Sequence, residues 1–166
     1  MNNKLLLSQI EEILKSNQNS SYYKITSMAN ISALLFHNMK DLNWLGFYIL
    51  ENDELILGPF QGKIACSNIK VGKGVCGKCA SISKTINVKN VHEFEGHIAC
   101  DSASNSELVV PIFKDNSFYA LIDIDSPLFD RFTIEDELFI SRQKKPPMQS
   151  TGGYFIVVSQ IGRIRS

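Results

Sequence analysis

The sequence lacks three features that would each point to a different class of protein. It has no excess of one charge, because seventeen Lys and Arg residues balance seventeen Asp and Glu residues. A balanced chain has no net field to gather nucleic acid or an anionic membrane, so any ligand must be recognised locally. It also has no apolar run near the roughly 20 residues that cross a bilayer, and no internal repeat. We therefore expect neither nucleic acid nor a membrane as a partner.

The opening segment, MNNKLLLSQIEEILK, places only three apolar residues together before Ser8, which is too few for the core of a signal peptide. The sequence therefore predicts a cytoplasmic protein, in a compartment where thiols are kept reduced. Four cysteines in such a protein favour redox chemistry or metal binding over structural disulfides.

The order of apolar patterns predicts the fold class. Apolar residues recur at helical spacing in the opening segment and again over 22–39. Strand-like segments follow over 43–50, 54–60, 85–88, 106–113 and 117–124. Between the second and third of these, residues 71–84 are typical of a glycine-rich turn that leads into a short helix. We expect an α/β (α+β) fold with a central, mostly antiparallel sheet flanked by helices.

The C-terminal part changes character after a last predicted helix. Thr133 and Asp136 fit a capped helix start. Further on, Pro146-Pro147 forbids a continuing helix. We therefore expect one domain over 1–140 and an atypical C-terminal tail over 141–166, whose structure the sequence does not define.

All four cysteines and two of the three histidines lie between Gly58 and Ile112. Within this segment Cys100 occupies a polar loop, HIACDSAS, where His97 or loop amides would favour the thiolate. A thiolate nucleophile becomes a sulfenic acid or a mixed disulfide, which a second cysteine resolves. The alternative is that Cys100 is a small buried apolar residue, as free cysteines often are.

Two further hypotheses use the same segment. A zinc ion would take four donors from the six Cys and His residues present, namely Cys66, Cys76, Cys79, Cys100, His92 and His97. Structural zinc sites usually show two close pairs of ligands, whereas here only Cys76 and Cys79 are closely spaced. That C-x-x-C pair would also suit a thioredoxin-like redox centre, but the surrounding βαβ pattern is absent from the sequence.

A second group of polar residues lies on predicted strands. Asp123 and Asp125 alternate with isoleucines, so period two puts both carboxylates on one face of the sheet. Like charges there are costly unless a cation, metal or ammonium group compensates them; the alternative is a strand end that faces water. Glu107 opens the neighbouring strand and would converge on the same place. Three carboxylates would suit magnesium or calcium, or an amino acid whose own carboxylate binds loop amides.

Two aromatic residues fall on the first predicted strand. Trp44 and Tyr48 lie four residues apart and therefore share a face. They would form an aromatic wall beside a ligand, or they would simply belong to the core.

Together these residues resemble the free methionine-(R)-sulfoxide reductase family, whose fold is a GAF domain. The similarity runs from about Ile31 to Asp136. The matching text is NWLGFYIL, ELILGPFQGKIAC, GKGVCG, VHEFEGHIACD, SELVVPIF and DIDSP. The order and spacing of Cys66, Cys76 and Cys100 match the three cysteines of the family. These motifs are specific in combination, and none of them is specific alone.

The resemblance implies a thiol mechanism. Cys100 would attack the sulfoxide sulfur, methionine would depart, and the sulfenic acid would condense with a resolving cysteine. Cys66 is our choice for that cysteine, with Cys76 as the second. Thioredoxin would then reduce the disulfide with electrons that come from NADPH, and no cofactor would be bound.

The resemblance also assigns the substrate site. Glu107, Asp123 and Asp125 would bind the substrate and help to protonate its oxygen, and Trp44 and Tyr48 would hold the methyl-sulfoxide end. A sulfoxide oxygen is a poor leaving group until it is protonated, so an acid that stays protonated near neutrality must lie beside it. A pocket that holds both the ammonium and the carboxylate leaves no room for peptide bonds, which implies free methionine-(R)-sulfoxide as the substrate.

Two departures from the family leave questions open. Lys78-Cys79 stands where the family usually has small uncharged residues, so Cys79 would either intercept the disulfide or only pack. Pro146-Pro147 interrupts the family's last amphipathic helix, which leaves a homodimer as an open expectation. The rival hypothesis is a GAF sensor that binds an amino acid or a nucleotide without turnover, although a sensor needs no set of three spaced thiols.

Overall fold

The computed structural model describes residues 3–16, 18–96 and 102–141. Within these ranges the chain forms α1 (Asn3–Lys15), α2 (Tyr23–Asn38), β1 (Trp44–Glu51), β2 (Glu54–Gly62), β3 (Asn68–Lys70), α3 (Gly74–Ile82), β4 (Ile86–Val88), η1 (Val91–Glu93), β5 (Ser106–Lys114), β6 (Ser117–Ser126) and α4 (Ile134–Ser141). The predicted order of elements is confirmed, with β3 and the 3-10 turn η1 added. His97, Cys100 and residues 142–166 of the predicted tail lie outside the described residues.

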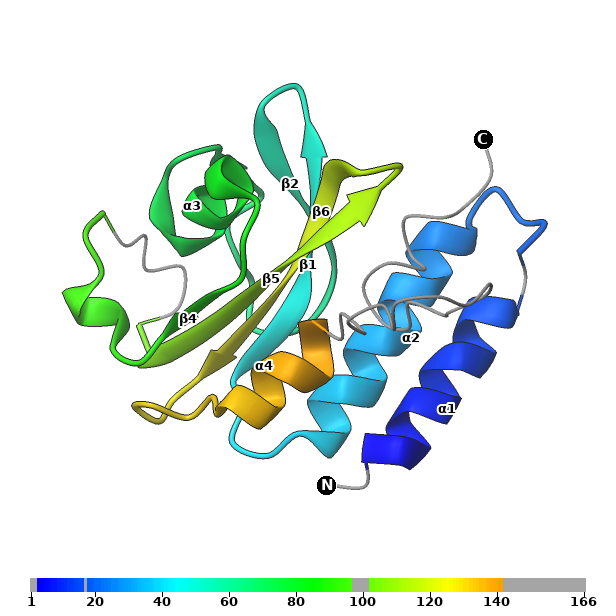
Figure 1. Ribbon diagram of the computed structural model, residues 1–166, viewed down its shortest axis with the longest axis horizontal. Helices are drawn as coiled ribbons and strands as arrows, with labels where there is room; N and C mark the ends of the chain where they lie inside the picture. Colours follow the sequence, from blue (N-terminus) through cyan, green and yellow to red (C-terminus); the bar gives the residue numbers. More distant parts are fainter. Residues whose placement is uncertain (1–2, 17, 97–101, 142–166) are drawn as a thin grey trace, which may run out of the picture.

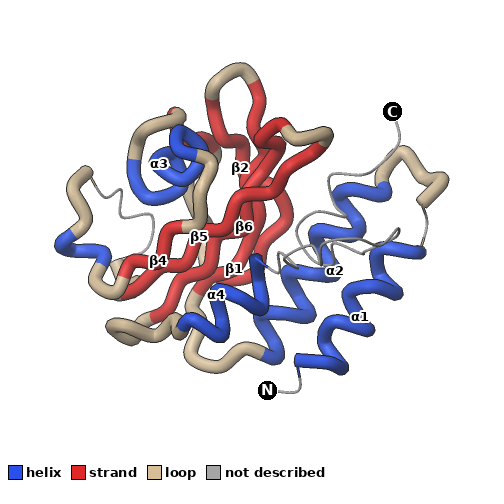
Figure 2. The backbone as a smooth tube through the Cα atoms, in the orientation of Figure 1, coloured by secondary structure: helices blue, strands red, loops and turns tan. Residues whose placement is uncertain are grey.

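A six-stranded sheet forms the centre of the molecule. Its strands follow the order β3-β2-β1-β6-β5-β4 and every neighbouring pair is antiparallel. The sheet is curled, with α3 on one face and α1, α2 and α4 against the other (Figures 1 and 2). The expected antiparallel sheet flanked by helices is therefore confirmed. No helix in the described part of the chain is both long and apolar enough to cross a membrane.

Side chains of the central strands alternate between two cores. On one face Leu45 and Phe47 of β1 pack under α1, α2 and α4, together with Leu108 of β5. On the other face Trp44 and Tyr48 of β1 lie in a smaller core beneath α3. The larger core supplies most of the apolar burial, since each fully buried large side chain contributes roughly 1.5–3 kcal/mol. The α3 face combines its smaller apolar core with buried polar residues, among them Glu107 and Asp123.

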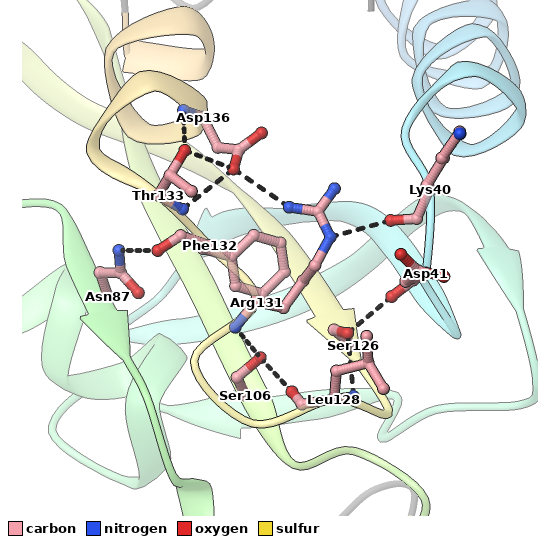
Figure 3. A network of polar contacts seen from close by, with 10 residues as sticks. All are labelled: Lys40, Asp41, Asn87, Ser106, Ser126, Leu128, Arg131, Phe132, Thr133 and Asp136. Atoms are coloured by element: carbon pink, nitrogen blue, oxygen red, sulfur yellow. Dashed lines mark hydrogen bonds and ion pairs between the residues drawn. The ribbon is translucent and has the colours of Figure 1, made fainter.

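Hydrogen bonds join the start of α4 to the loop that follows α2 (Figure 3). Asp136 N donates to Thr133 Oγ1 at 3.2 Å and Thr133 N donates to Asp136 Oδ2 at 2.9 Å, which confirms the predicted cap. Arg131 Nη1 donates to the same Oδ2 at 3.0 Å, and Arg131 Nε donates to Lys40 O at 3.0 Å. One arginine thus connects two loops at this edge of the sheet.

Two serines fasten the strand ends to the same loops. Ser106 Oγ donates to Leu128 O at 2.7 Å, and Ser126 Oγ donates to Asp41 O at 2.6 Å (Figure 3). Because successive strand residues point to opposite faces, the neighbours of these serines on the strands face α3. The loops therefore fix the ends of β5 and β6 from behind the site.

Gly46 makes room for the aromatic residues of the α3 face. A Cβ at this position would lie 2.4 Å from Phe60 Cβ and 2.5 Å from the Trp44 ring. The Trp44 and Phe60 rings stack over this space with centroids 5.3 Å apart and planes inclined at 17°. The close approach of the two rings thus depends on a residue without a side chain.

We expect Gly46→Ala to lower the free energy of unfolding by about 2 kcal/mol, because overpacking forces the rings apart. Urea unfolding would measure the loss. Gly58→Ala is the matched control on β2, where the nearest atom to the added Cβ is Phe47 O at 3.0 Å. Equal losses in the two variants would contradict the role given to Gly46.

Candidate functional site

Three carboxylates meet on the α3 face of the sheet. Glu107 pairs with Asp125 across β5 and β6, and Asp125 pairs in turn with Trp44 of β1. Asp123 lies two residues from Asp125 on the same face, and opposite Val109. Glu107 is 6% exposed and Asp123 is 7% exposed. The predicted convergence is confirmed, and the alternative of a strand end facing water is wrong for Asp123.

These carboxylates line a pocket between the sheet and the start of α3. Its empty volume is about 540 Å³, with open solvent at the mouth included. The wall combines acidic, aromatic and thiol side chains with backbone from the start of α3. The lining residues are Trp44, Tyr48, Ile64, Ala65, Ile69, Lys73, Gly74, Val75, Cys76, Ser104, Glu107, Asp123 and Asp125.

Burial determines the protonation of the acids. It raises the pKa of Glu107 well above its ordinary value, with the nearby Asp123 and Asp125 carboxylates adding to the effect. Burial likewise raises the pKa of Asp123 from 3.8 to about 6, against the opposing effect of hydrogen bonds from Cys76 and Glu107. Two adjacent carboxyls in one apolar pocket resist ionising together. The protonated form of these acids is therefore favoured to higher pH than in an exposed carboxyl.

Cys76 lies directly against Glu107. Its Sγ donates to Glu107 Oε1 at 3.8 Å, a long hydrogen bond even for sulfur. Burial, reinforced by Asp123 and Glu107, raises the pKa of the Cys76 thiol well above its usual range, and burial raises the pKa of Cys79 to about 12. A nucleophilic cysteine needs a lowered pKa and access to solvent. Both thiols of the predicted C-x-x-C pair lack these properties.

Trp44 and Tyr48 share a face, as their spacing predicts, and their rings stack with centroids 6.0 Å apart. They also hold the β2–β3 connection, a role that the sequence does not reveal. Trp44 Nε1 donates to Lys63 O at 3.1 Å, and the Tyr48 hydroxyl donates to Cys66 O at 3.0 Å. The aromatic pair therefore forms part of the core, lines the pocket and positions the backbone of Cys66.

The described cysteines differ in redox state and in access. Cys66 is disulfide-bonded and half-buried. Cys76 and Cys79 carry free thiols and are buried. The structure thus separates one accessible cysteine in the loop from two inaccessible ones on α3.

The start of α3 supplies the electropositive part of the pocket. Lys73, Gly74 and Val75 line it, and N–H groups in the first turn of a helix have no acceptor within the helix. The helix dipole places partial positive charge at the same end, so an anion is favoured there. Gly77 lets α3 approach the end of β3 closely, because a Cβ at Gly77 would lie 2.5 Å from Lys70 O.

The zinc ligand set considered from the sequence as an alternative is not assembled among the described residues. His92 is exposed and its Nε2 shares a hydrogen bond with Asn105 Oδ1 at 2.8 Å. Cys79 packs in the small core, away from the pocket lining. The structure instead places Cys76 beside Glu107 and Asp123.

Two curated relatives are similar over most of the chain. The chain is 54% identical over 113 residues to the protein named free methionine-R-sulfoxide reductase of Escherichia coli (strain K12), which covers 68% of each chain. It is 43% identical over 129 residues to the protein of the same name from Saccharomyces cerevisiae, which covers 73% of this chain and 72% of the other. No protein-family model matches the chain.

Solved structures agree with the curated relatives. The reduced form of fRMsr of Staphylococcus aureus is 47% identical with a TM-score of 0.79, covering 85% of this chain and 89% of that one. The free methionine-R-sulfoxide reductase of Neisseria meningitidis in complex with its substrate is 35% identical with a TM-score of 0.78, covering 84% and 82%. A GAF domain is 37% identical with a TM-score of 0.77, covering 86% and 85%. The expected GAF-type fold is confirmed.

The raised pKa of Asp123 predicts a dependence of stability on pH. The unfolded chain loses this proton near 3.8, whereas the folded protein keeps it up to about 6. The folded state binds more protons in this window, so the free energy of unfolding falls as the pH rises from about 4 to about 6. Asp123→Asn removes the titrating carboxyl. As the pH rises from 4 to 7, we expect the free energy of unfolding of this variant to increase relative to that of wild type by on the order of 1–3 kcal/mol.

Urea unfolding at both pH values would measure this gain. Asp115→Asn, which removes an exposed carboxyl in the β5–β6 turn, controls for the loss of a charge. Parallel pH curves for wild type and Asp123→Asn would show that the carboxyl is not perturbed.

We also expect Tyr48→Phe to lower the free energy of unfolding by about 1 kcal/mol, since Cys66 O loses its donor. Urea unfolding would measure this loss, and Tyr22→Phe, at an exposed position, is the matched control. An unchanged stability in Tyr48→Phe would mean that the hydroxyl does not hold the loop.

Proposed function

Because the chain belongs to the free methionine-R-sulfoxide reductase family, we propose that it reduces free L-methionine-(R)-sulfoxide to L-methionine in the pocket beneath α3. The family consists of enzymes, and membership confirms the resemblance read from the motifs. The observation that carries the proposal is the buried acid pair Glu107 and Asp123, which meets the aromatic wall and the start of α3 in one pocket. This combination matches the three chemical parts of the substrate.

The pocket offers a partner to each end of the amino acid. The carboxylates of Asp125 and Asp123 would bind the ammonium group by charge-assisted hydrogen bonds. The amides of Gly74 and Val75 would bind the carboxylate at the positive end of α3. The methyl-sulfoxide end would then lie against Trp44. A peptide-bound sulfoxide has neither free end, which supports the free amino acid as substrate.

The buried acid would supply the proton that the sulfoxide oxygen needs. The pKa of Glu107 is raised, because burial and two neighbouring carboxylates disfavour its charge, and we infer that it would keep its proton to donate. A proton on the oxygen makes the sulfur electrophilic, so the Cys100 thiolate would attack it. The bond that this attack forms between Cys100 Sγ and the sulfoxide sulfur breaks as the hydroxyl passes to Sγ. This leaves a sulfenic acid on Cys100, and methionine departs with the electron pair of the broken bond on its sulfur. Thus one thiol is oxidised as one sulfoxide is reduced.

The sulfenic acid would then condense with a second thiol and release water, forming a disulfide. Cys66 is the proposed resolving cysteine, ahead of Cys76. Among the described cysteines Cys66 is disulfide-bonded and half-buried, whereas Cys76 is a buried free thiol. Thioredoxin would attack the disulfide by thiol–disulfide exchange, with NADPH as the source of electrons and no bound cofactor.

The activity test compares three substrates in an assay that couples NADPH consumption to thioredoxin and thioredoxin reductase. We expect turnover of free L-methionine-(R)-sulfoxide, and none of the S epimer or of a peptide-bound sulfoxide. Cys100→Ser should lose turnover by more than about a thousandfold, since catalysis through the covalent intermediate disappears. Cys79→Ser is the matched control and should keep it, because Cys79 lies outside the pocket lining.

A single-turnover measurement separates the two steps. Cys66→Ser should release one methionine per protein and then stop, with the sulfenic acid trapped. If Cys76→Ser gave that result instead, Cys76 would be the resolving cysteine. Folded wild-type protein without turnover on any sulfoxide would contradict the reductase proposal and favour a ligand-binding GAF sensor.

A further inference from the structure

The acid pair and the thiol of α3 form a set of potential metal ligands. Cys76 Sγ, one oxygen of Glu107 and one oxygen of Asp123 lie within 4.8 Å of one another, and all three residues are buried. The Cys76 Sγ and Glu107 Oε1 atoms are 3.8 Å apart. Tetrahedral zinc, with bonds of about 2.3 Å to sulfur and 2.1 Å to oxygen, separates these two atoms by about 3.6 Å. Cys76 and Glu107 are therefore already spaced to share an ion, and Asp123 lies within reach of it.

A second observation points to a missing partner in the same place. The Oδ1 atom of Asp123 is buried and makes no hydrogen bond. A buried polar atom without a partner is costly, so it indicates a group that binds there. Asp123 also lines the pocket, through which such a group would enter.

We propose that Cys76, Glu107 and Asp123 bind one divalent zinc ion, and that the bound ion excludes the sulfoxide from the pocket. The thiolate selects a borderline cation such as Zn²⁺ over Mg²⁺ or Ca²⁺, which prefer oxygen ligands. Three protein ligands leave a fourth position, directed at the pocket, for water. The protons of Cys76 and Glu107 leave to solvent on binding, and no electron is transferred.

This site differs from the zinc site considered from the sequence, because carboxylates of β5 and β6 replace the histidines and the other cysteines. It also opposes catalysis, since the ion would occupy the acid that protonates the sulfoxide. The exclusion of substrate rests on the proposed function, whereas metal binding itself does not. Intracellular zinc would thus inhibit the enzyme reversibly.

The binding test uses Co²⁺ as a spectroscopic probe and full-length protein with Cys66→Ser and Cys100→Ser, so that only the α3 thiols remain. Reduced protein should bind one equivalent and show the thiolate-to-cobalt charge-transfer band, which Zn²⁺ should then displace. Adding Cys76→Ser should abolish the band. Adding Cys79→Ser, the matched control, should retain it. Asp123→Asn should weaken cobalt binding by at least about a hundredfold. This exceeds the typical loss when a residue that only hydrogen-bonds to a metal ligand is removed.

Circular dichroism would establish that each variant is folded. A band that survives Cys76→Ser, or that is lost in Cys79→Ser, would overturn the site, as would the absence of binding to folded protein.

In wild type, Zn²⁺ should raise the apparent KM for the sulfoxide and leave kcat unchanged. Cobalt binding without reductase activity would refute the proposed function alone, whereas full activity that saturating Zn²⁺ leaves unchanged would refute the inhibition.

Discussion

The burial of Glu107 beside Asp123 is the constraint on which the rest of the structure depends. Two adjacent carboxyls in an apolar setting cost free energy, because neither has the hydration that it has in water. The opposite face of the sheet offsets this cost by packing α1, α2 and α4 over a larger apolar core. Alternation along β5 and β6 keeps the two environments apart, so stabilising residues and reactive residues share strands without sharing a face.

The aromatic pair couples the pocket to the loop that carries Cys66. Trp44 and Tyr48 line the pocket, and their polar groups donate to backbone carbonyls between β2 and β3. Large aromatic side chains are suited to this double role, because one end is apolar and the other needs a hydrogen-bond partner. The pocket wall and the backbone of Cys66 thus depend on the same two residues, and the absence of a side chain at Gly46 keeps the rings in place.

Periodicity predicted the parts of the site that belong to one strand or one hairpin. Asp123 and Asp125 share a face by period two, and a short turn between β5 and β6 brings Glu107 opposite Asp125. The cap of α4 was also predictable, since it depends on residues three apart. The contact between Cys76 and Glu107 was not, because it depends on how α3 packs across the sheet. Strand β3 has three residues, too few for a periodic signal.

The position of each cysteine in the fold, more than its spacing in the sequence, determines which reactions its thiol can take part in. A resolving cysteine must reach its partner and then be reached by a reductant, which requires access to solvent. Cys76 lacks that access, and its neighbours are acids that disfavour a thiolate. The same surroundings suit a thiol that donates to Glu107, because the hydrogen bond helps to orient the acid. A cation that replaces the proton of this thiol would gain the two carboxylates as further ligands. The geometry that would supply an acid for the proposed sulfoxide reduction would thus also suit a thiophilic metal.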